Sequence, residues 1–220
     1  MATGSSCPLG FASSKAAGQQ DAEVVTNQPS QECPIGAGIA AASQPSSSSS
    51  SSPPGVDNLS RDREVSSIPC TGGDKFMYPS ERQFFTSANA KGHDLDPNDM
   101  SMVVAIHNAV NERAWQEILR FESIHASDCA VPTLSRFIGR PGDISPKARM
   151  LGLLGRSPPF DRHDWHIDRC GHKVRYLVDF YDGKPTPEAP VSIYVDARPE
   201  VSFGGLRDRL TLWAKDSGFL

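Results

Sequence analysis

The stretch "KVRYLVDFY", residues 173–181, decides the fold that we expect for this chain. Its apolar residues alternate, as in a strand with one buried side: Val174, Tyr176, Val178 and Phe180. The stretch "VSIYVDAR", residues 191–198, repeats this alternation, and the Gly- and Pro-containing loop between the two suits a hairpin. The sequence therefore predicts a small antiparallel sheet.

Helical patterns precede the hairpin. Asp96 followed by Pro97 indicates a helix start, because proline is favoured at the first helical position. Apolar residues at helical spacing follow, and we expect Asn111 to cap a second helix over residues 112–126. His107 is therefore expected near the junction of two helices.

Two further helices are expected outside this region. Residues 76–86 indicate a loop entering a short helix that Ser80 can cap, and residues 205–216 predict a last helix with one apolar side. Residues 126–160 are rich in Pro, Gly and Arg, which predicts an irregular connection with one turn around "SPKAR". Together these patterns predict an α+β fold in which helices pack on a small antiparallel sheet.

The first 66 residues differ in composition from the rest. They contain one basic residue before Arg61, namely Lys15, and an unbroken run of serines over residues 46–52. A segment with so little apolar surface cannot offset its ordering entropy, so we expect residues 1–66 to be a disordered Ser/Ala/Pro-rich tail. Residues 67–220 then form one folded domain, long enough for a single compact core.

Charge and hydropathy exclude two classes of protein. The net charge of −4 lacks the basic excess of most nucleic-acid binders, so no nucleic-acid partner is expected. The longest apolar run, residues 102–106, is far shorter than the roughly 18 residues that span a bilayer. Any membrane contact is therefore expected to be peripheral.

The five cysteines stand at positions 7, 33, 70, 129 and 170. Their number is odd, and even the closest pair is too far apart for a CxxC zinc or redox motif. This spacing predicts five independent reduced thiols rather than a disulfide framework.

The tail nevertheless repeats one short pattern, "SSCPLG" at Cys7 and "QECPIG" at Cys33. A Cys-Pro dipeptide followed by an aliphatic residue has the form of a heme regulatory motif. A thiolate binds ferric iron, and the proline turns the chain away so that the flat macrocycle can approach. Chance occurrence of the dipeptide is the alternative, and two copies in a cysteine-poor tail weigh against it.

His107 lies beside Asn108 and is followed by Glu112 about one helical turn later. A lone histidine on a helix is most often a satisfied surface or core side chain. A neutral imidazole is also the standard axial ligand of heme iron. An adjacent amide or carboxylate could then hold the second ring nitrogen and fix the ring plane.

Residues 159–171, "PFDRHDWHIDRCG", combine two histidines with both charge signs and a tryptophan. His163, His166 and Asp168 could form a zinc or iron site, but the helical HExxH order of many metal hydrolases is absent. The plainest alternative is a charged turn that leads into the strand at residue 173.

A third interpretation makes the same stretch the edge of a ligand pocket. Arg162 and Arg169 could bind carboxylates. His163 with Asp164 could form an imidazole and its orienting acid, and Trp165 could form an apolar wall. A tryptophan between two aspartates favours this interpretation over the charged turn.

Several short stretches, in order, match one family: "YPS", "IHN", "AWQEIL", "SPKAR", "PFDRHDW", "DRCG" and "VRYLVDFY". Together they resemble the holocytochrome c synthase family, the mitochondrial cytochrome c-type heme lyases. The resemblance spans about residues 66–215. Phe121 departs from the family pattern, which has tryptophan there, and Trp213 is alone in a last helix that is usually richer in tryptophan. His166 has no counterpart in the pattern.

The resemblance implies an enzyme, a lyase that joins heme to apocytochrome c, or to cytochrome c1, through thioethers between the heme vinyls and a Cys-x-x-Cys-His motif. Heme is then a bound substrate. The family's enzyme-side axial ligand matches His107, and Asn108 and Glu112 match residues that support it. The second motif matches His163 as a further catalytic residue and four heme-pocket residues, namely Arg162, Asp164, Trp165 and Arg169.

The resemblance also implies a location in the mitochondrial intermembrane space, peripheral on the inner membrane.

The residues themselves leave two other classes of function open. A heme chaperone or sensor without lyase activity needs only the Cys-Pro motifs and one axial histidine. A mononuclear metal hydrolase would use His163 and His166 instead.

Overall fold

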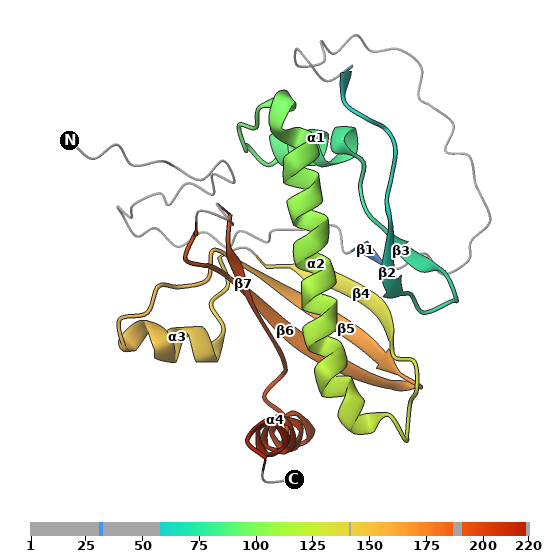
Figure 1. Cartoon of the computed structure of the whole chain (residues 1–220), viewed down its shortest axis with the longest axis vertical. Coiled ribbons are helices and arrows are strands. Elements are labelled where there is room, and N and C mark those ends of the chain that lie inside the picture. The colour runs from blue at the N-terminus through green and yellow to red at the C-terminus, as the bar shows by residue number, and fades with distance from the viewer. Residues whose placement is uncertain (1–30, 33–57, 141, 187–190, 219–220) are drawn as a thin grey trace, which may run out of the picture.

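The computed structural model describes residues 31–32, 58–140, 142–186 and 191–218, and it has the predicted α+β fold (Figure 1). The larger sheet is antiparallel and has the strand order β1–β4–β5–β6–β7. Its strands are β1 Gln31–Glu32, β4 Thr133–Gly139, β5 Asp161–Arg169, β6 His172–Asp182 and β7 Ile193–Pro199. A second antiparallel sheet pairs β2 Val65–Pro69 with β3 Lys75–Met77.

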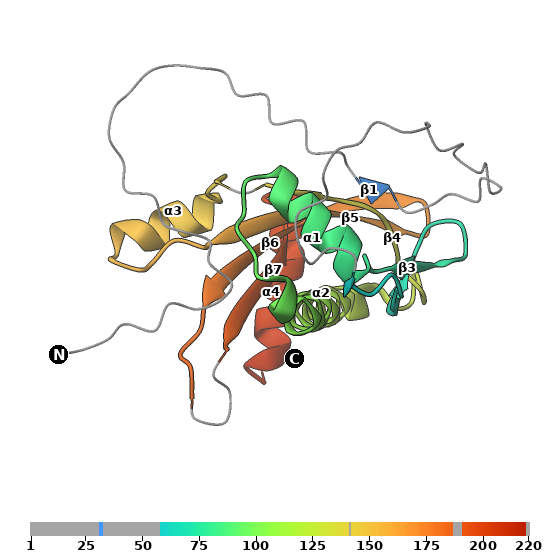
Figure 2. The ribbon, with the colours of Figure 1, turned by 90° about the horizontal axis from the view of Figure 1, so that it is seen from above.

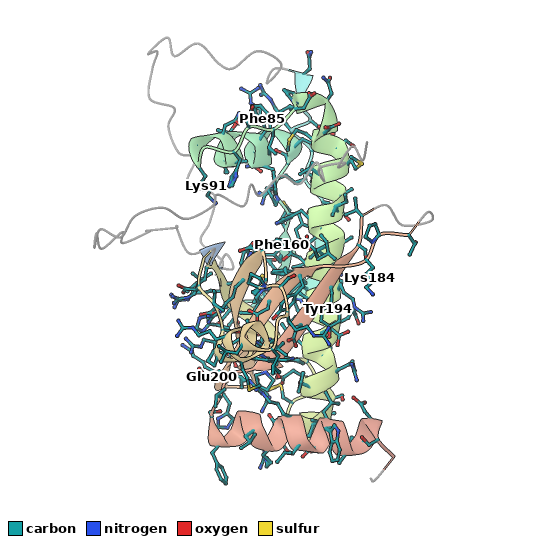
Figure 3. All side chains as sticks on the ribbon, turned by 90° about the vertical axis from the view of Figure 1, so that its left-hand side faces the viewer. Phe85, Lys91, Phe160, Lys184, Tyr194 and Glu200 are labelled. Atoms are coloured by element: carbon teal, nitrogen blue, oxygen red, sulfur yellow. A yellow bond between two sulfur atoms is a disulfide. The ribbon has the colours of Figure 1, made fainter. Side chains whose placement is uncertain are left out.

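The described residues form four α-helices around the sheets: α1 Glu81–Ala90, α2 Met100–Glu122, α3 Pro146–Leu153 and α4 Phe203–Asp216. Short 3₁₀ helices, Pro97–Asp99 and Ser123–His125, flank α2. The long α2 crosses one face of the larger sheet (Figure 1), and a view from above shows α4 beside α2 (Figure 2). The side view places α4 at the end of the molecule opposite α1, the helix that carries Phe85 (Figure 3).

The main core lies between α2 and the sheet. Trp115 and Ile118 of α2 pack there with Trp165 of β5 and Tyr176 and Val178 of β6. These side chains are almost fully buried. Burial of a large apolar side chain stabilises a fold by about 1.5–3 kcal/mol, so this contact fixes where α2 lies on the sheet.

The opposite face of the sheet is polar where α3 begins. Ser145 caps α3 and donates from Oγ to Asp179 Oδ2 at 2.6 Å, and the Arg198 guanidinium donates to the same carboxylate. All three side chains are buried, and Lys147 on α3 adds an ion pair of 2.6 Å with Asp196. A hydrogen-bonded charge network therefore joins α3 to the sheet.

Two expectations about the elements are wrong. Asn111 caps no second helix, because α2 is continuous through it and its side chain donates to the His107 carbonyl one turn earlier, at 2.8 Å. Residues 126–160 are not wholly irregular, since β4 lies within them and pairs with β5. The turn expected around "SPKAR" is α3, and the caps at Ser80 and Asp96 are confirmed.

The expectation of five reduced thiols is also wrong. Cys129 and Cys170 form a disulfide across a Cα–Cα distance of 5.5 Å, and Cys70 is disulfide-bonded as well. Cys170 occupies the tight turn between β5 and β6, with a φ of 47°, and Gly171 follows it with a φ of 97°. The fold brings together residues far apart in sequence, which spacing alone could not indicate.

The described structure includes residues 58–66, which the sequence analysis assigned to the tail. Leu59 is buried in a small second core with Phe85, Met100 and Val103, and β2 begins at Val65. The two Cys-Pro motifs, at Cys7 and Cys33, lie outside the described residues.

Candidate functional site

His107 lies on α2 at the end of the helix nearest α1. Its ring meets Phe84 edge-on at a centroid distance of 5.1 Å and Tyr78 at 6.3 Å. Burial lowers the pKa of His107 to about 4, while the hydrogen bond with Asn108 acts weakly in the opposite direction. The imidazole is therefore neutral near pH 7, which is the form that binds a metal ion.

The amide of Asn108 contacts His107 directly. Its Oδ1 lies 3.3 Å from His107 Nδ1, and its Nδ2 donates to Glu64 Oε2 at 2.8 Å. The sequence indicated that a neighbouring amide or carboxylate could hold this nitrogen, and the amide does so.

Glu112, predicted as a catalytic residue, does not contact His107 among the hydrogen bonds of the described residues. Its carboxylate accepts from the Ser67 backbone at 2.8 Å, from the Ser67 hydroxyl, and from the Tyr78 hydroxyl at 3.1 Å. Burial and the negative charge of Glu112 raise the pKa of Tyr78. Glu112 therefore ties β2 and the Tyr78 wall of the site to α2.

His163 and Trp165 lie on the face of β5 that meets α2. His163 packs edge-on against Phe180 at 4.9 Å and lies 5.9 Å from Phe137, which is also 5.9 Å from Trp165. A positive charge on His163 contributes to the lowering of the His107 pKa, after burial, so the two histidines that the sequence predicted as catalytic interact electrostatically.

Two polar atoms on this face of β5 have no hydrogen-bond partner among the described residues. They are His163 Nδ1 and Trp165 Nε1, and both are buried. Buried polar atoms normally have partners, so these two unpaired atoms are available to a ligand. A neutral axial base, aromatic walls and free polar atoms together suit a planar aromatic ligand with a metal centre, such as heme.

The expected pairing of His163 with Asp164 is wrong. His163 Nε2 lies 3.1 Å from Asp161 Oδ2, because residues two apart in a strand share a face. Asp164 points to the other face, where Arg140 and Arg162 each reach its carboxylate at 2.9 Å. Arg162 and Asp164 are therefore not brought to the His107 side of the sheet.

Arg169 lies at the far end of β5. Its guanidinium makes two hydrogen bonds with Glu122, of 2.7 and 2.8 Å, and lies 3.6 Å from Asp208 of α4. Six residues of strand separate it from His163, which is about 20 Å. The structure therefore does not bring Arg169 together with His107.

His166 stands on the opposite face of β5 from His163, because three residues separate them in a strand. The two histidines cannot ligate one ion from these positions. Among the described residues, no group of three His, Cys, Asp or Glu side chains could hold a metal ion. The mononuclear hydrolase therefore has no donor set in this part of the chain.

Three residues of the site were not predicted from the sequence: Asp161, Glu64 and Phe137. The alternation of β5 could have indicated Asp161, had residues 161–169 been treated as a strand. Glu64 and Phe137 come from β2 and β4 regions far from α2 in sequence, and only the fold brings them to the site.

Comparison with known proteins decides the family. The sequence model of the cytochrome c/c1 heme lyases matches residues 1–213. The chain belongs to the cytochrome c/c1 heme lyase family. The family consists of lyases that act on heme as a substrate, which agrees with the donor set around His107.

Three relatives of the heme lyase family carry the name holocytochrome c-type synthase. The Gallus gallus protein is 42% identical over 69% of this chain, and the Homo sapiens protein is 42% identical over 69%. The Bos taurus protein is 39% identical over 81% of this chain. The matches span 59%, 60% and 71% of these relatives, respectively. No solved structure matches the chain.

Proposed function

We propose that this heme lyase is a holocytochrome c synthase, which attaches heme covalently to apocytochrome c or c1. The observation that carries the proposal is the neutral His107 imidazole on α2, together with the unpaired polar atoms of His163 and Trp165 on the face of β5 that meets α2. The names of the relatives support the same reaction.

The chemistry needs alignment more than strong acid or base. Each substrate thiol adds across one heme vinyl group, so that the sulfur bonds to one vinyl carbon and the thiol hydrogen ends on the other. No oxidant or reductant is consumed in this step. Holding both thiols and both vinyls in register therefore supplies most of the acceleration.

In this account His107 holds the heme iron from the enzyme side, and the histidine of the substrate motif approaches from the other side. Phe84 and Tyr78 limit the rotation of the His107 ring. Trp165 and His163 would meet the macrocycle edge with their unpaired nitrogens. Glu112 acts indirectly, because it holds Tyr78 in place.

Co-expression with apocytochrome c tests the proposal. The covalent product is measured as heme staining at the size of cytochrome c on a denaturing gel. We expect product with this chain and none without it. A protein that binds heme but yields no covalent product would instead be a heme chaperone or sensor.

The tail motifs are proposed as accessory heme contacts. Cys7 and Cys33 each precede a proline, as in heme regulatory motifs. A chain with both Cys7→Ser and Cys33→Ser should still give covalent product in the co-expression assay. Loss of product from a well-expressed double variant would make these thiols essential.

We also propose that the protein works in the mitochondrial intermembrane space, peripherally on the inner membrane. No helix of the described residues is long and apolar enough to cross a bilayer. One helix, α4, does present apolar side chains to solvent: Phe203 is 94% exposed, and Leu206, Leu210 and Trp213 are 54–60% exposed. Its buried residues are Gly205 and the charged Asp208, which supports an apolar partner on the outward face.

A further inference from the structure

The amide of Asn108 lies between a carboxylate and the proposed heme ligand. Asn108 is 5% exposed, so both ends of its side chain must be satisfied within the protein. One end lies 2.8 Å from Glu64 Oε2 and the other 3.3 Å from His107 Nδ1. Glu64 comes from the segment before β2, far from α2 in sequence.

The charge of Glu64 decides which way the amide faces. An ionised carboxylate can only accept hydrogen bonds, so the NH₂ end of Asn108 must face Glu64. The carbonyl end then faces His107 and can only accept. Nδ1 of His107 must therefore carry the ring proton, and Nε2 is left with its lone pair.

A second amide lies beside the ring without selecting a tautomer. Asn111 donates from Nδ2 to the His107 carbonyl at 2.8 Å, and the same nitrogen lies 3.3 Å from His107 Nε2 and 3.5 Å from His107 Nδ1. The nitrogen is nearly equidistant from the two ring nitrogens and is already bonded to the carbonyl. The tautomer therefore follows from the contact with Asn108.

Glu64 is itself held in place. Its carbonyl accepts from the Tyr78 backbone at 2.9 Å, and the neighbouring Arg63 donates from Nε to the Tyr78 carbonyl at 2.9 Å. The carboxylate is thus presented to Asn108 by the segment that enters the small β2–β3 sheet, and Tyr78, directly after β3, also forms one wall of the site.

We propose that Glu64 is a positioning residue, which acts through Asn108 to fix His107 in the tautomer whose Nε2 can bind iron. This inference rests on the proposed role of His107 as the heme ligand. An acceptor behind the ring also makes the imidazole a stronger base toward a metal. Loss of such a partner typically weakens metal binding by about 10- to 100-fold.

The heme-free protein gives a direct test. ¹⁵N NMR of the His107 ring distinguishes the two tautomers, and a His107→Gln spectrum identifies its signals. The full chain should show Nδ1 protonated. Glu64→Lys places a group that only donates beside Asn108, so the amide should turn over and the proton should move to Nε2. An unchanged tautomer in folded Glu64→Lys protein overturns the proposal.

Asp62→Lys is the matched control, because Asp62 is an exposed acid in the same segment and the charge change is the same. It should leave the tautomer unchanged. If Glu64→Lys does not fold, Glu64→Gln can replace it, and the fraction with protonated Nδ1 should fall. A Glu64→Gln protein with the full wild-type fraction overturns the proposal equally.

Titration with ferric heme separates this inference from the proposed function. Glu64→Gln should bind heme about 10- to 100-fold more weakly than Asp62→Asn protein. A wild-type chain that forms no cytochrome c would refute the proposed reaction and leave the tautomer result standing. Equal heme affinity of the two variants would refute the role of Glu64 and leave the reaction untouched.

Discussion

His107 is kept neutral by burial, and its orientation depends on neighbours from three parts of the chain. Phe84 and Tyr78 limit its ring, and Asn108 holds Nδ1. The His107 side chain is half-buried, and desolvation penalises its charged form, which favours the neutral imidazole. The property that suits His107 to bind iron therefore also makes the fold sensitive to acid.

We predict that acid destabilises the heme-free protein through His107. Its pKa is about 4 when folded and 6.5 in the exposed state, so the unfolded chain binds the proton first as pH falls through that window. Between pH 7 and pH 4.5 the wild type should lose about 2–3 kcal/mol more unfolding free energy than His107→Gln protein. Urea unfolding at both pH values measures this. Equal losses in the two proteins would contradict it.

The alternation of β5 shows what the sequence could predict at the site and what it could not. The motif around His163 was found from residue types alone. Its division between two faces required knowing that Asp161–Arg169 is a strand, and the dense charges hid the strand pattern. Position 164 looked like the partner of His163, yet position 161 holds that role because alternate residues share a face.

At the scale of elements, the prediction of the fold succeeded where apolar periodicity is strong and failed where it is weak. The β6 and β7 strands and the caps of α1 and of the 3₁₀ turn before α2 were predicted. The continuous α2 was divided wrongly, because the preference of asparagine for caps is weaker than the helix signal on both sides of Asn111. The strand β4 was missed among its Pro, Gly and Arg neighbours.

The far end of α2 is joined to three other elements by buried charge. Glu122 of α2 accepts from Arg169 of β5 and, at 2.6 Å, from the Tyr176 hydroxyl of β6. His125 Nε2 lies 2.9 Å from Asp208 of α4, which also approaches Arg169. The Cys129–Cys170 disulfide closes the same end covalently.

We predict that Arg169 acts on stability rather than on heme contact. Arg169→Met leaves the buried Glu122 without its bidentate partner and should lower the unfolding free energy by about 3–5 kcal/mol. The heme bound per folded molecule should stay at the wild-type level. Arg120→Met, which removes an exposed ion pair with Asp216, should cost less than about 1 kcal/mol. A stable Arg169→Met protein with reduced heme binding would contradict this assignment.

At the scale of the whole molecule, the two ends differ in the side chains that they carry. α1 and α4 lie at opposite ends of the molecule (Figure 3). His107 packs against Phe84 of α1, and His163 packs against Phe180 of β6. The solvent-facing side of α4 carries apolar side chains, and Arg207 and Lys215 beside them are exposed and basic. Apolar side chains flanked by cations suit the surface of an anionic bilayer.

We predict that α4 mediates the proposed membrane contact. Leu206→Asn with Leu210→Asn should reduce co-sedimentation with anionic vesicles at least several-fold. The double variant loses the free energy that is gained when two leucine side chains move from water into the bilayer. Leu153→Asn with Leu154→Asn, at the C-terminal end of α3, where both leucines are exposed, is the control and should sediment like wild type. Unchanged sedimentation of the α4 variant would contradict the assignment.

The central claim is that His107, and not His163, holds the heme iron during attachment. Covalent cytochrome c formed on co-expression measures it most directly, with His107→Ala, His163→Ala and the exposed His172→Ala compared at equal protein level. The account predicts that His107→Ala loses nearly all product, His163→Ala a part and His172→Ala none. Wild-type product from His107→Ala, together with loss of product from His163→Ala, would contradict it and move the iron ligand to β5.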